Sequence, residues 1–268
     1  MTDQRDAQLI ADDATTGRAI SPRRKGDRLT DFLVRRFKPI CQLSRGEADL
    51  VRDASATARE IDRNVSWRAP RSGEVAPAFV ASGWSAVECH LADGRRQILS
   101  LLLPGDEIGF AGRFLPQSAA VVALTRTIIV DAAELLDAAC NDPEGDGLAC
   151  ARRHLAEVSE AFLLNQILRL GRMTAFERVA HLFAELHWRL GQVGFAGARG
   201  TILPLSQETI AHTLGLSAIH VNRTLRQLKE DGLVEIKSGK AWLAGAGRLA
   251  EISGFAPPPI NGKAKVAE

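Results

Sequence analysis

The chain has 268 residues, a formal net charge of +2 and 46% hydrophobic residues. This hydrophobic content excludes a wholly disordered chain, and the small net charge excludes a histone-like coat of positive charge. No stretch reaches the roughly 18 apolar residues of a membrane-spanning helix, and residues 1–30 lack the apolar run of a signal peptide. We therefore expect a cytoplasmic protein with no membrane partner.

Nothing in the sequence has the pattern of an enzyme. The four cysteines, Cys41, Cys89, Cys140 and Cys150, form no Cys-x-x-Cys pair, which argues against a zinc or iron–sulfur site. Only His90 of the six histidines lies in the β-rich region, whereas a cupin metal site needs a cluster of ligands. Nucleophile elbows and phosphate loops are also absent from the sequence. We predict no catalytic residue and no metal site.

The first third of the folded chain is predicted to be β-rich after a short helical start at Thr30–Phe37 and Ser44–Ala54. The predicted strands are Phe79–Leu91, Arg96–Leu103, Ala119–Leu124 and Thr127–Val130. Asp93-Gly94 lies between the first two strands and is a strong hairpin signal. Short strands separated by turns favour an antiparallel sandwich or a jelly roll.

A helical region follows. Asp131 and Glu134 have the spacing of a capping box at the start of a short helix. A long helix is then predicted from apolar residues spaced three and four apart, with Gly171 ending or bending it. These residues are Leu155, Val158, Phe162, Leu163, Ile167 and Leu170. The stripe packs either on the β-rich region or on a second copy of the chain. A further helix is expected over Thr174–Leu190.

The pattern of residues 201–255 predicts a winged helix-turn-helix. Ser206 is placed to cap a helix over Gln207–Leu214, Gly215 to end it, and Ser217 to cap a second helix over Ala218–Glu230. We expect one set of apolar residues to pack the two helices against each other: Ile210, Ala211, Leu214, Leu216, Val221 and Leu225. Two short strands, Leu233–Ile236 and Ala241–Leu243, flank a basic tip that resembles a wing.

The second helix offers side chains that suit a DNA major groove. An arginine pairs bidentately with guanine and an asparagine with adenine, and no acidic residue precedes Glu230 in this helix. The predicted DNA-binding residues are Ser206, Gln207, Ser217, Ala218, Ile219, His220, Asn222, Arg223, Arg226, Lys237 and Lys240. The competing interpretation is a helical hairpin with a solvated basic face, used only for protein interaction.

Several segments in order resemble the cyclic-AMP-receptor and fumarate-nitrate-reduction regulator (Crp/Fnr) family. They are residues 93–98, 104–109, 178–186, 203–207, 214–217 and 220–225. The resemblance implies an α+β fold: an N-terminal cyclic-nucleotide-binding-like β jelly roll, a long dimerisation helix and a C-terminal winged helix-turn-helix. It also implies a homodimer bound to a two-fold operator.

The resemblance suggests domain boundaries. We predict a flexible arm over 1–30, a sensor domain over 31–147 and a dimerisation helix over 148–171. The DNA-binding domain then covers 172–255, and residues 256–268, which contain three consecutive prolines, form a flexible tail.

The chain departs from the family in its predicted effector pocket, formed by Gly109, Phe110, Gln117 and Ser118. Members that bind cyclic AMP have Glu where Phe110 stands and Arg where Gln117 stands. A buried phosphate without a cation is costly, so we do not expect cyclic AMP as a ligand. The cysteine cluster of the iron–sulfur members is absent too. No cofactor is predicted, and haem is left open with His90 as the candidate axial ligand.

The sequence as a whole predicts a DNA-binding transcription regulator controlled by a signal other than cyclic AMP. Its predicted partners are double-stranded DNA, a second copy of the chain and RNA polymerase. Ile219 stands where the family often has Glu, so the operator is expected to differ from that of the cyclic-AMP receptor. The alternatives are an effector-independent regulator and a protein-interaction module with a vestigial sensor domain.

Overall fold

The structure, a computed structural model, describes residues 33–34, 36–67, 76–109, 119–195, 201–237, 240–243 and 246–258. The described residues form two compact units. The N-terminal unit lies within residues 13–85 and 102–161, and the C-terminal unit comprises 86–101 and 162–257. In this described part of the chain, no helix is both long and apolar enough to cross a membrane.

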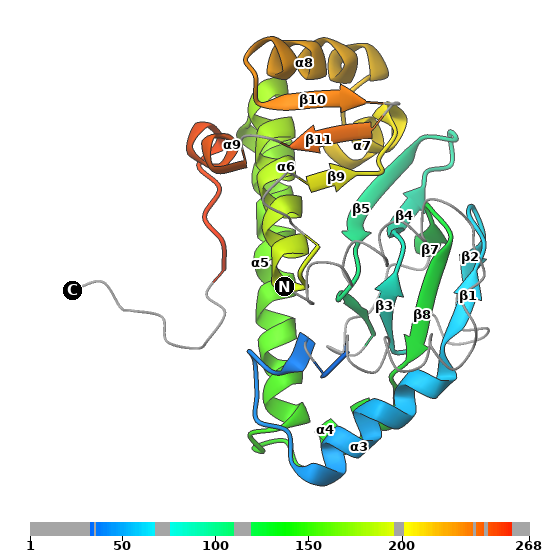
Figure 1. The fold of residues 1–268 in the computed structure, drawn as a ribbon. Helices are drawn as coiled ribbons and strands as arrows, with labels where there is room; N and C mark the ends of the chain where they lie inside the picture. The colour runs from blue at the N-terminus through cyan, green and yellow to red at the C-terminus, as the bar shows by residue number, and fades with distance from the viewer. Residues whose placement is uncertain are drawn as a thin grey trace. The chain divides into compact units, whose positions relative to one another are not determined.

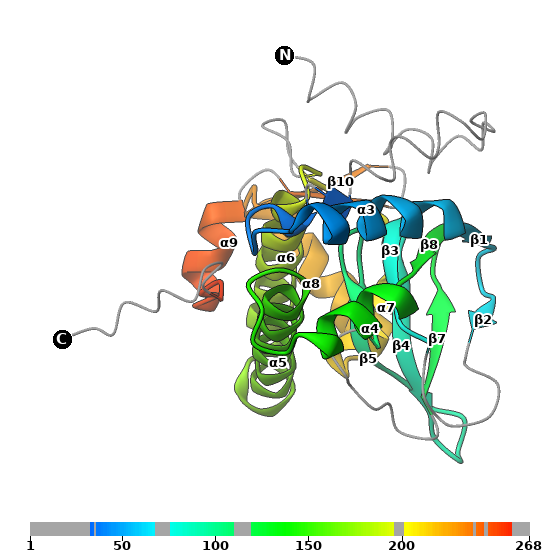
Figure 2. The same cartoon turned by 90° about the horizontal axis from the view of Figure 1, so that it is seen from below.

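Helices of the N-terminal unit are joined through one acidic side chain. Helix α3 (Arg45–Ala54) starts with a capping box in which Ser44 and Glu47 satisfy each other's backbone N–H groups. Glu47 also accepts a hydrogen bond of 2.6 Å from the backbone N–H of Leu148, the first residue of α5 (Leu148–Arg172). Helix α4 (Ala133–Asn141) packs against α3. Figure 2 shows both helices from below.

The strands of this unit are short and antiparallel. One four-stranded sheet has the order β1 (Arg59–Ile61), β8 (Thr127–Asp131), β3 (Ala78–Ser82) and β6 (Glu107–Ile108). In addition, β2 (Ser66–Trp67) pairs with β7 (Ala119–Ala123). The sheet covers a core in which the buried rings of Phe37 and Phe79 meet edge to face at 5.4 Å. A turn of the 3-10 type, η1 (Ser55–Thr57), links α3 to β1.

Two sequence predictions in this unit are wrong in detail. The strand predicted over Phe79–Leu91 is broken at Gly83, which has φ +81°. A Cβ there would lie 2.2 Å from the carbonyl oxygen of Arg126, so only glycine fits this turn. The capping box predicted for Asp131 and Glu134 does not form either. Ala132 is the N-cap of α4, and Asp131 Oδ1 accepts instead from the N–H of Ala133 at 2.8 Å.

The C-terminal unit begins with the hairpin that the sequence predicts. Strands β4 (Ser85–His90) and β5 (Arg96–Leu102) flank a turn in which Gly94 has φ +84°. The N–H of Leu91 donates to the carbonyl of Arg95 at 2.8 Å, and the N–H of Gly94 donates back to Leu91 at 3.0 Å. The hairpin prediction is therefore confirmed.

Two long helices support this unit. Helix α5 has 25 residues, about 37 Å of helix, and it ends at Arg172, one residue after Gly171, where the sequence predicted an end or a bend. Helix α6 (Ala175–Gln192) has the capping box Thr174/Glu177 at its start. Helix α9 (Ala246–Ser253), which was not predicted, lies beside α6 (Figure 1).

The remaining elements form a winged helix-turn-helix. Helix α7 (Gln207–Leu214) and helix α8 (Ala218–Glu230) precede two paired strands, β10 (Val234–Lys237) and β11 (Lys240–Leu243). A third strand, β9 (Thr201–Leu203), pairs with β11 and completes a sheet of order β10-β11-β9 (Figure 1). The two helices and the wing are confirmed, whereas β9 was not predicted.

Candidate nucleic-acid interface

Three local signals set the geometry of the helix-turn-helix. The Ser206 hydroxyl accepts from the N–H of Thr209 at 3.0 Å and caps α7. Gly215 ends α7 with φ +61°, and its N–H donates to the carbonyl of Ala211. Ser217 then caps α8 by accepting from the N–H of His220 at 3.3 Å. The chain therefore leaves α7 and enters α8 within three residues.

The two helices pack through the predicted apolar set. All of these side chains are buried except Leu216, which is half-buried. Ala211 is 3% exposed and small enough for the close approach of the helices. Beneath them, α6 buries Ala180, Leu182, Phe183, Leu186 and Leu190, as its pattern predicts. The exposed side of α8 is therefore held on a rigid, apolar base.

The predicted DNA-binding side chains lie on the outside of this base. In the described chain, nine of the eleven are exposed: Ser206, Gln207, Ser217, Ala218, Ile219, His220, Asn222, Arg223 and Arg226. Ile219 is 81% exposed, the highest value among the exposed large hydrophobic residues. Ile219 therefore takes no part in core packing and is available for contact.

These exposed residues differ in how they are held. His220 Nδ1 lies 2.9 Å from the Ser217 hydroxyl, so the imidazole ring is hydrogen-bonded to the N-cap residue. Arg226 is paired with Glu230 at 3.0 Å, one turn further along α8. Asn222 donates to Gln207 of α7 at 3.1 Å. Among the described residues Arg223 has no such partner, and its guanidinium is open to a ligand.

The wing carries the last two predicted residues. Lys237 ends β10 and Lys240 starts β11, and the two face each other in the antiparallel register. Residues 238–239, between them, lie outside the described chain. The backbone therefore places both predicted lysines at the tip end of the wing.

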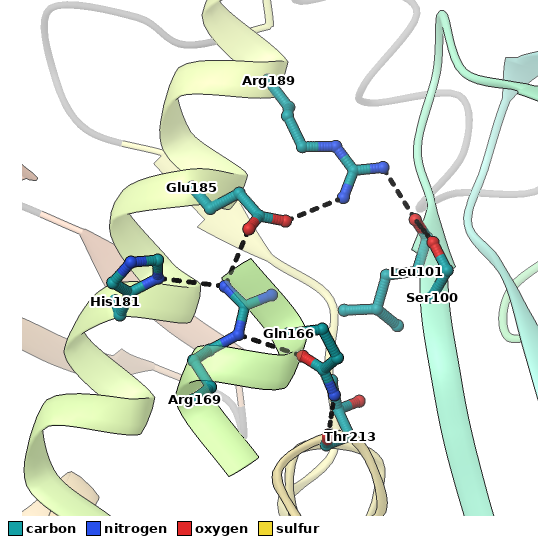
Figure 3. Close-up of polar contacts among 8 residues, drawn as sticks. All are labelled: Ser100, Leu101, Gln166, Arg169, His181, Glu185, Arg189 and Thr213. Atoms are coloured by element: carbon teal, nitrogen blue, oxygen red, sulfur yellow. Dashed lines mark hydrogen bonds and ion pairs between the residues drawn. The ribbon is translucent and has the colours of Figure 1, made fainter. Parts of the chain in front are cut away.

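A buried cluster of charges joins α5 and α6 (Figure 3). Glu185 of α6 accepts from Arg169 of α5 at 2.7 Å and from Arg189 of α6 at 3.2 Å. Arg169 and Glu185 are each 2% exposed. Two guanidinium groups share one carboxylate here, so the carboxylate is what allows both cations to remain in the core.

The cluster extends to a histidine and to the helix-turn-helix. Arg169 Nη1 lies 3.1 Å from His181 Nδ1, and burial followed by the charge of Arg169 lowers the pKa of His181 to about 4. His181 is therefore neutral at pH 7 and accepts the hydrogen bond. Gln166 accepts from Arg169 and donates to the carbonyl of Thr213, near the end of α7 (Figure 3).

The β4–β5 hairpin contacts the same elements. Arg189 Nη2 donates to the carbonyl of Leu101 at 2.7 Å, as Figure 3 shows. Arg96 Nε donates to His212 Nδ1 at 2.8 Å, and Gln97 Nε2 donates to the carbonyl of Thr213 at 3.2 Å. None of these contacts was predicted, because each joins residues that are far apart in the sequence.

Of the four residues in the predicted effector pocket, one lies within the described residues. Gly109 is described and has φ +76°, whereas Phe110, Gln117 and Ser118 lie outside the described residues. His90 lies 2.9 Å from Glu88, so its ring already has a partner. Within the described ranges, no group of three or more histidine, cysteine or acidic side chains could hold a metal ion.

Comparison with known proteins agrees with this geometry. Residues 177–252, from α6 to α9, match the Crp-like helix-turn-helix domain. The chain is 35% identical over 162 residues to the nitrogen fixation regulation protein FixK of Azorhizobium caulinodans, covering 60% of this chain and 64% of that one. It is 32% identical over 169 residues to FixK of Rhizobium meliloti, covering 60% and 70%. The chain belongs to the Crp/Fnr family.

Solved structures of this family share the fold. FixK2 from Bradyrhizobium japonicum matches with a TM-score of 0.62 and 27% identity, over 75% of this chain and 98% of that chain. A CRP-family regulator from Thermus thermophilus matches with a TM-score of 0.55 and 19% identity, over the same shares. The predicted α+β fold class is confirmed.

Replacing the central carboxylate should destabilise the C-terminal unit. Glu185→Gln keeps the side-chain shape but removes the negative charge that Arg169 and Arg189 share, so we expect a loss of about 3–5 kcal/mol in the free energy of unfolding. Urea unfolding followed by circular dichroism measures it. Glu230→Gln, which breaks the exposed pair with Arg226, is the matched control and should cost about 0.5 kcal/mol or less. Equal losses in the two variants would contradict the role given to Glu185.

Proposed function

We propose that this protein is a DNA-binding transcription regulator that recognises its operator through helix α8. The observation that carries the proposal is the exposed side of α8. It presents Arg223 without a protein partner among the described residues and has no acidic residue before Glu230. The opposite side of the helix is buried on α7 and α6. This is the arrangement that a recognition helix needs to enter a major groove.

The side chains available on α8 suggest which bases it contacts. Arg223 can donate two parallel hydrogen bonds to O6 and N7 of guanine. Ile219, which is almost fully exposed, can contact only an apolar group, and the thymine methyl is the one that the major groove offers. We propose that Lys237 and Lys240, which pair across the wing strands, contact phosphates, which would add affinity without base preference.

The names of the relatives support a regulatory role. Two of them are FixK proteins named for the regulation of nitrogen fixation. A third, 29% identical over 170 residues, is the transcriptional activator protein FnrL of Cereibacter sphaeroides. The match spans 65% of FnrL and 60% of this chain. By analogy we assign this chain to transcription regulation rather than catalysis, with RNA polymerase as a further partner.

We also propose that the regulator is a homodimer formed through α5. Leu155 and Val158, in the first part of the helix, are buried, so this part of the predicted stripe packs within the N-terminal unit. Farther along, five apolar residues are 36–66% exposed: Leu163, Leu164, Ile167, Leu168 and Leu170. An apolar helix face of this kind is stabilised when a second copy covers it. A two-fold dimer places two α8 helices on half-sites about 34 Å apart.

Removing Arg223 should weaken operator binding while the fold is kept. We expect Arg223→Ala to lose about 1–3 kcal/mol of specific binding, a roughly 5- to 150-fold rise in Kd. Fluorescence anisotropy on an operator selected by the wild-type protein measures it. Arg63→Ala, an exposed arginine of the N-terminal unit, is the control and should bind like wild type. Wild-type affinity in Arg223→Ala would show that Arg223 does not recognise a base.

A charge on the exposed face of α5 should prevent dimerisation. Ile167 is 66% exposed, so Ile167→Glu leaves the core intact but places a carboxylate in the proposed interface. We expect light scattering to give a dimer mass for wild type and a monomer mass for Ile167→Glu. Ile252→Glu, at an exposed apolar residue of α9, should remain a dimer. A wild-type protein that is monomeric both free and on DNA would refute the dimer.

A further inference from the structure

Two exposed carboxamides connect the helices of the helix-turn-helix. Asn222 Nδ2 donates to Gln207 Oε1 at 3.1 Å. Gln207 is the first residue of α7, and Asn222 lies in the second turn of α8, fifteen positions later. Both residues are exposed, so the bond crosses from one helix to the other on the outer surface of the motif.

This bond determines which groups of Asn222 remain available. A carboxamide has two N–H donors and one carbonyl acceptor. With one N–H donated to Gln207, Asn222 keeps one N–H and its carbonyl oxygen. Adenine in the major groove presents an acceptor at N7 and a donor at N6, and recognition requires one N–H and one carbonyl side by side. When the N–H donated to Gln207 is the one on the side away from the carbonyl oxygen, the groups left available are the complement of adenine.

The bond also restricts the rotation of the Asn222 side chain. An exposed asparagine on a helix samples several orientations, and binding one base requires that a single orientation be selected at an entropic cost. The acceptor of Gln207 lies on a different helix, and both helices are anchored by buried apolar residues. Asn222 is therefore oriented before DNA arrives, which reduces the cost of forming the contact with the base.

We propose that Gln207 is a positioning residue that holds Asn222 in the orientation that recognises adenine, so that the two amides act together on one A·T pair of each half-site. This inference rests on the proposed function. Arg223 and Ile219 lie one position after and three positions before Asn222, and they contact other bases. A hydrogen bond between two exposed, uncharged amides adds little to the free energy of unfolding. Its main consequence is therefore for base discrimination.

The test measures the Kd of the 268-residue chain for its selected operator and for a set of altered operators. In each altered operator, one A·T pair of a half-site is replaced. The ratio of the two Kd values is the base discrimination at that pair. We expect Asn222→Ala to lose roughly 5- to 150-fold discrimination at one A·T pair. Gln207→Met, which removes the acceptor, should lose at least about 3-fold discrimination at that same pair. The double variant should lose no more than Asn222→Ala alone, because the two residues act as one unit.

Two further variants distinguish positioning from other roles. Gln207→Glu keeps an acceptor for Asn222 but adds a negative charge, so we expect wild-type discrimination with weaker binding to every sequence. Gln227→Ala, an exposed glutamine of α8, should behave like wild type. Matching circular dichroism spectra show that each variant is folded.

The outcomes separate this inference from the proposed function. Selective binding by wild type with unchanged discrimination in Gln207→Met would overturn the inference alone. An equal loss of affinity on all sequences in Gln207→Met would also overturn it, since that result indicates only a phosphate contact. A wild-type protein that selects no duplex would overturn both proposals.

Discussion

The carboxylate of Glu185 is the group on which the geometry of the C-terminal unit depends. It is buried with Arg169 and Arg189, whose guanidinium groups lie 2.7 and 3.2 Å from it, and these short contacts offset the cost of burying the charges. Through these contacts, the end of α5, the middle of α6 and the end of β5 share one polar centre (Figure 3). Hydrogen bonds require directions that apolar packing does not, so the cluster specifies how these elements meet.

The helix-turn-helix is built outward from that centre. Gln166 donates to the carbonyl of Thr213, which places the end of α7 on α5, and Gly215 then turns the chain into α8. Serine caps at the start of both helices satisfy backbone N–H groups that the short helices would otherwise expose. The inner side of α8 is packed on α7 and α6, and its outer side is exposed, where we propose that DNA binds. A rigid support of this kind is what base recognition at hydrogen-bond distances requires.

Short-range signals in the sequence predicted the motif well, and long-range contacts were missed. The caps Ser206 and Ser217 and the turns at Gly94 and Gly215 depend on neighbouring residues, so they could be predicted. The break at Gly83 depends on Arg126, which lies 43 positions away, and strand β9 depends on pairing with β11. Nothing local distinguishes Glu185 from a solvated helix residue. The exposure of nine predicted DNA-binding side chains followed correctly from the helical period, but the bond between Gln207 and Asn222 required the structure.

We propose that two copies of this chain recognise a two-fold DNA sequence through α8. We would select from a pool of randomised duplexes with the purified 268-residue chain at a fixed salt concentration of about 0.1 M, because phosphate contacts make the affinity salt-dependent. We expect enrichment of an inverted repeat whose half-sites are centred about one turn of DNA apart, each containing guanine and adenine. Enrichment of a single unrepeated site would contradict the dimer, and the absence of any enriched sequence would contradict recognition through α8.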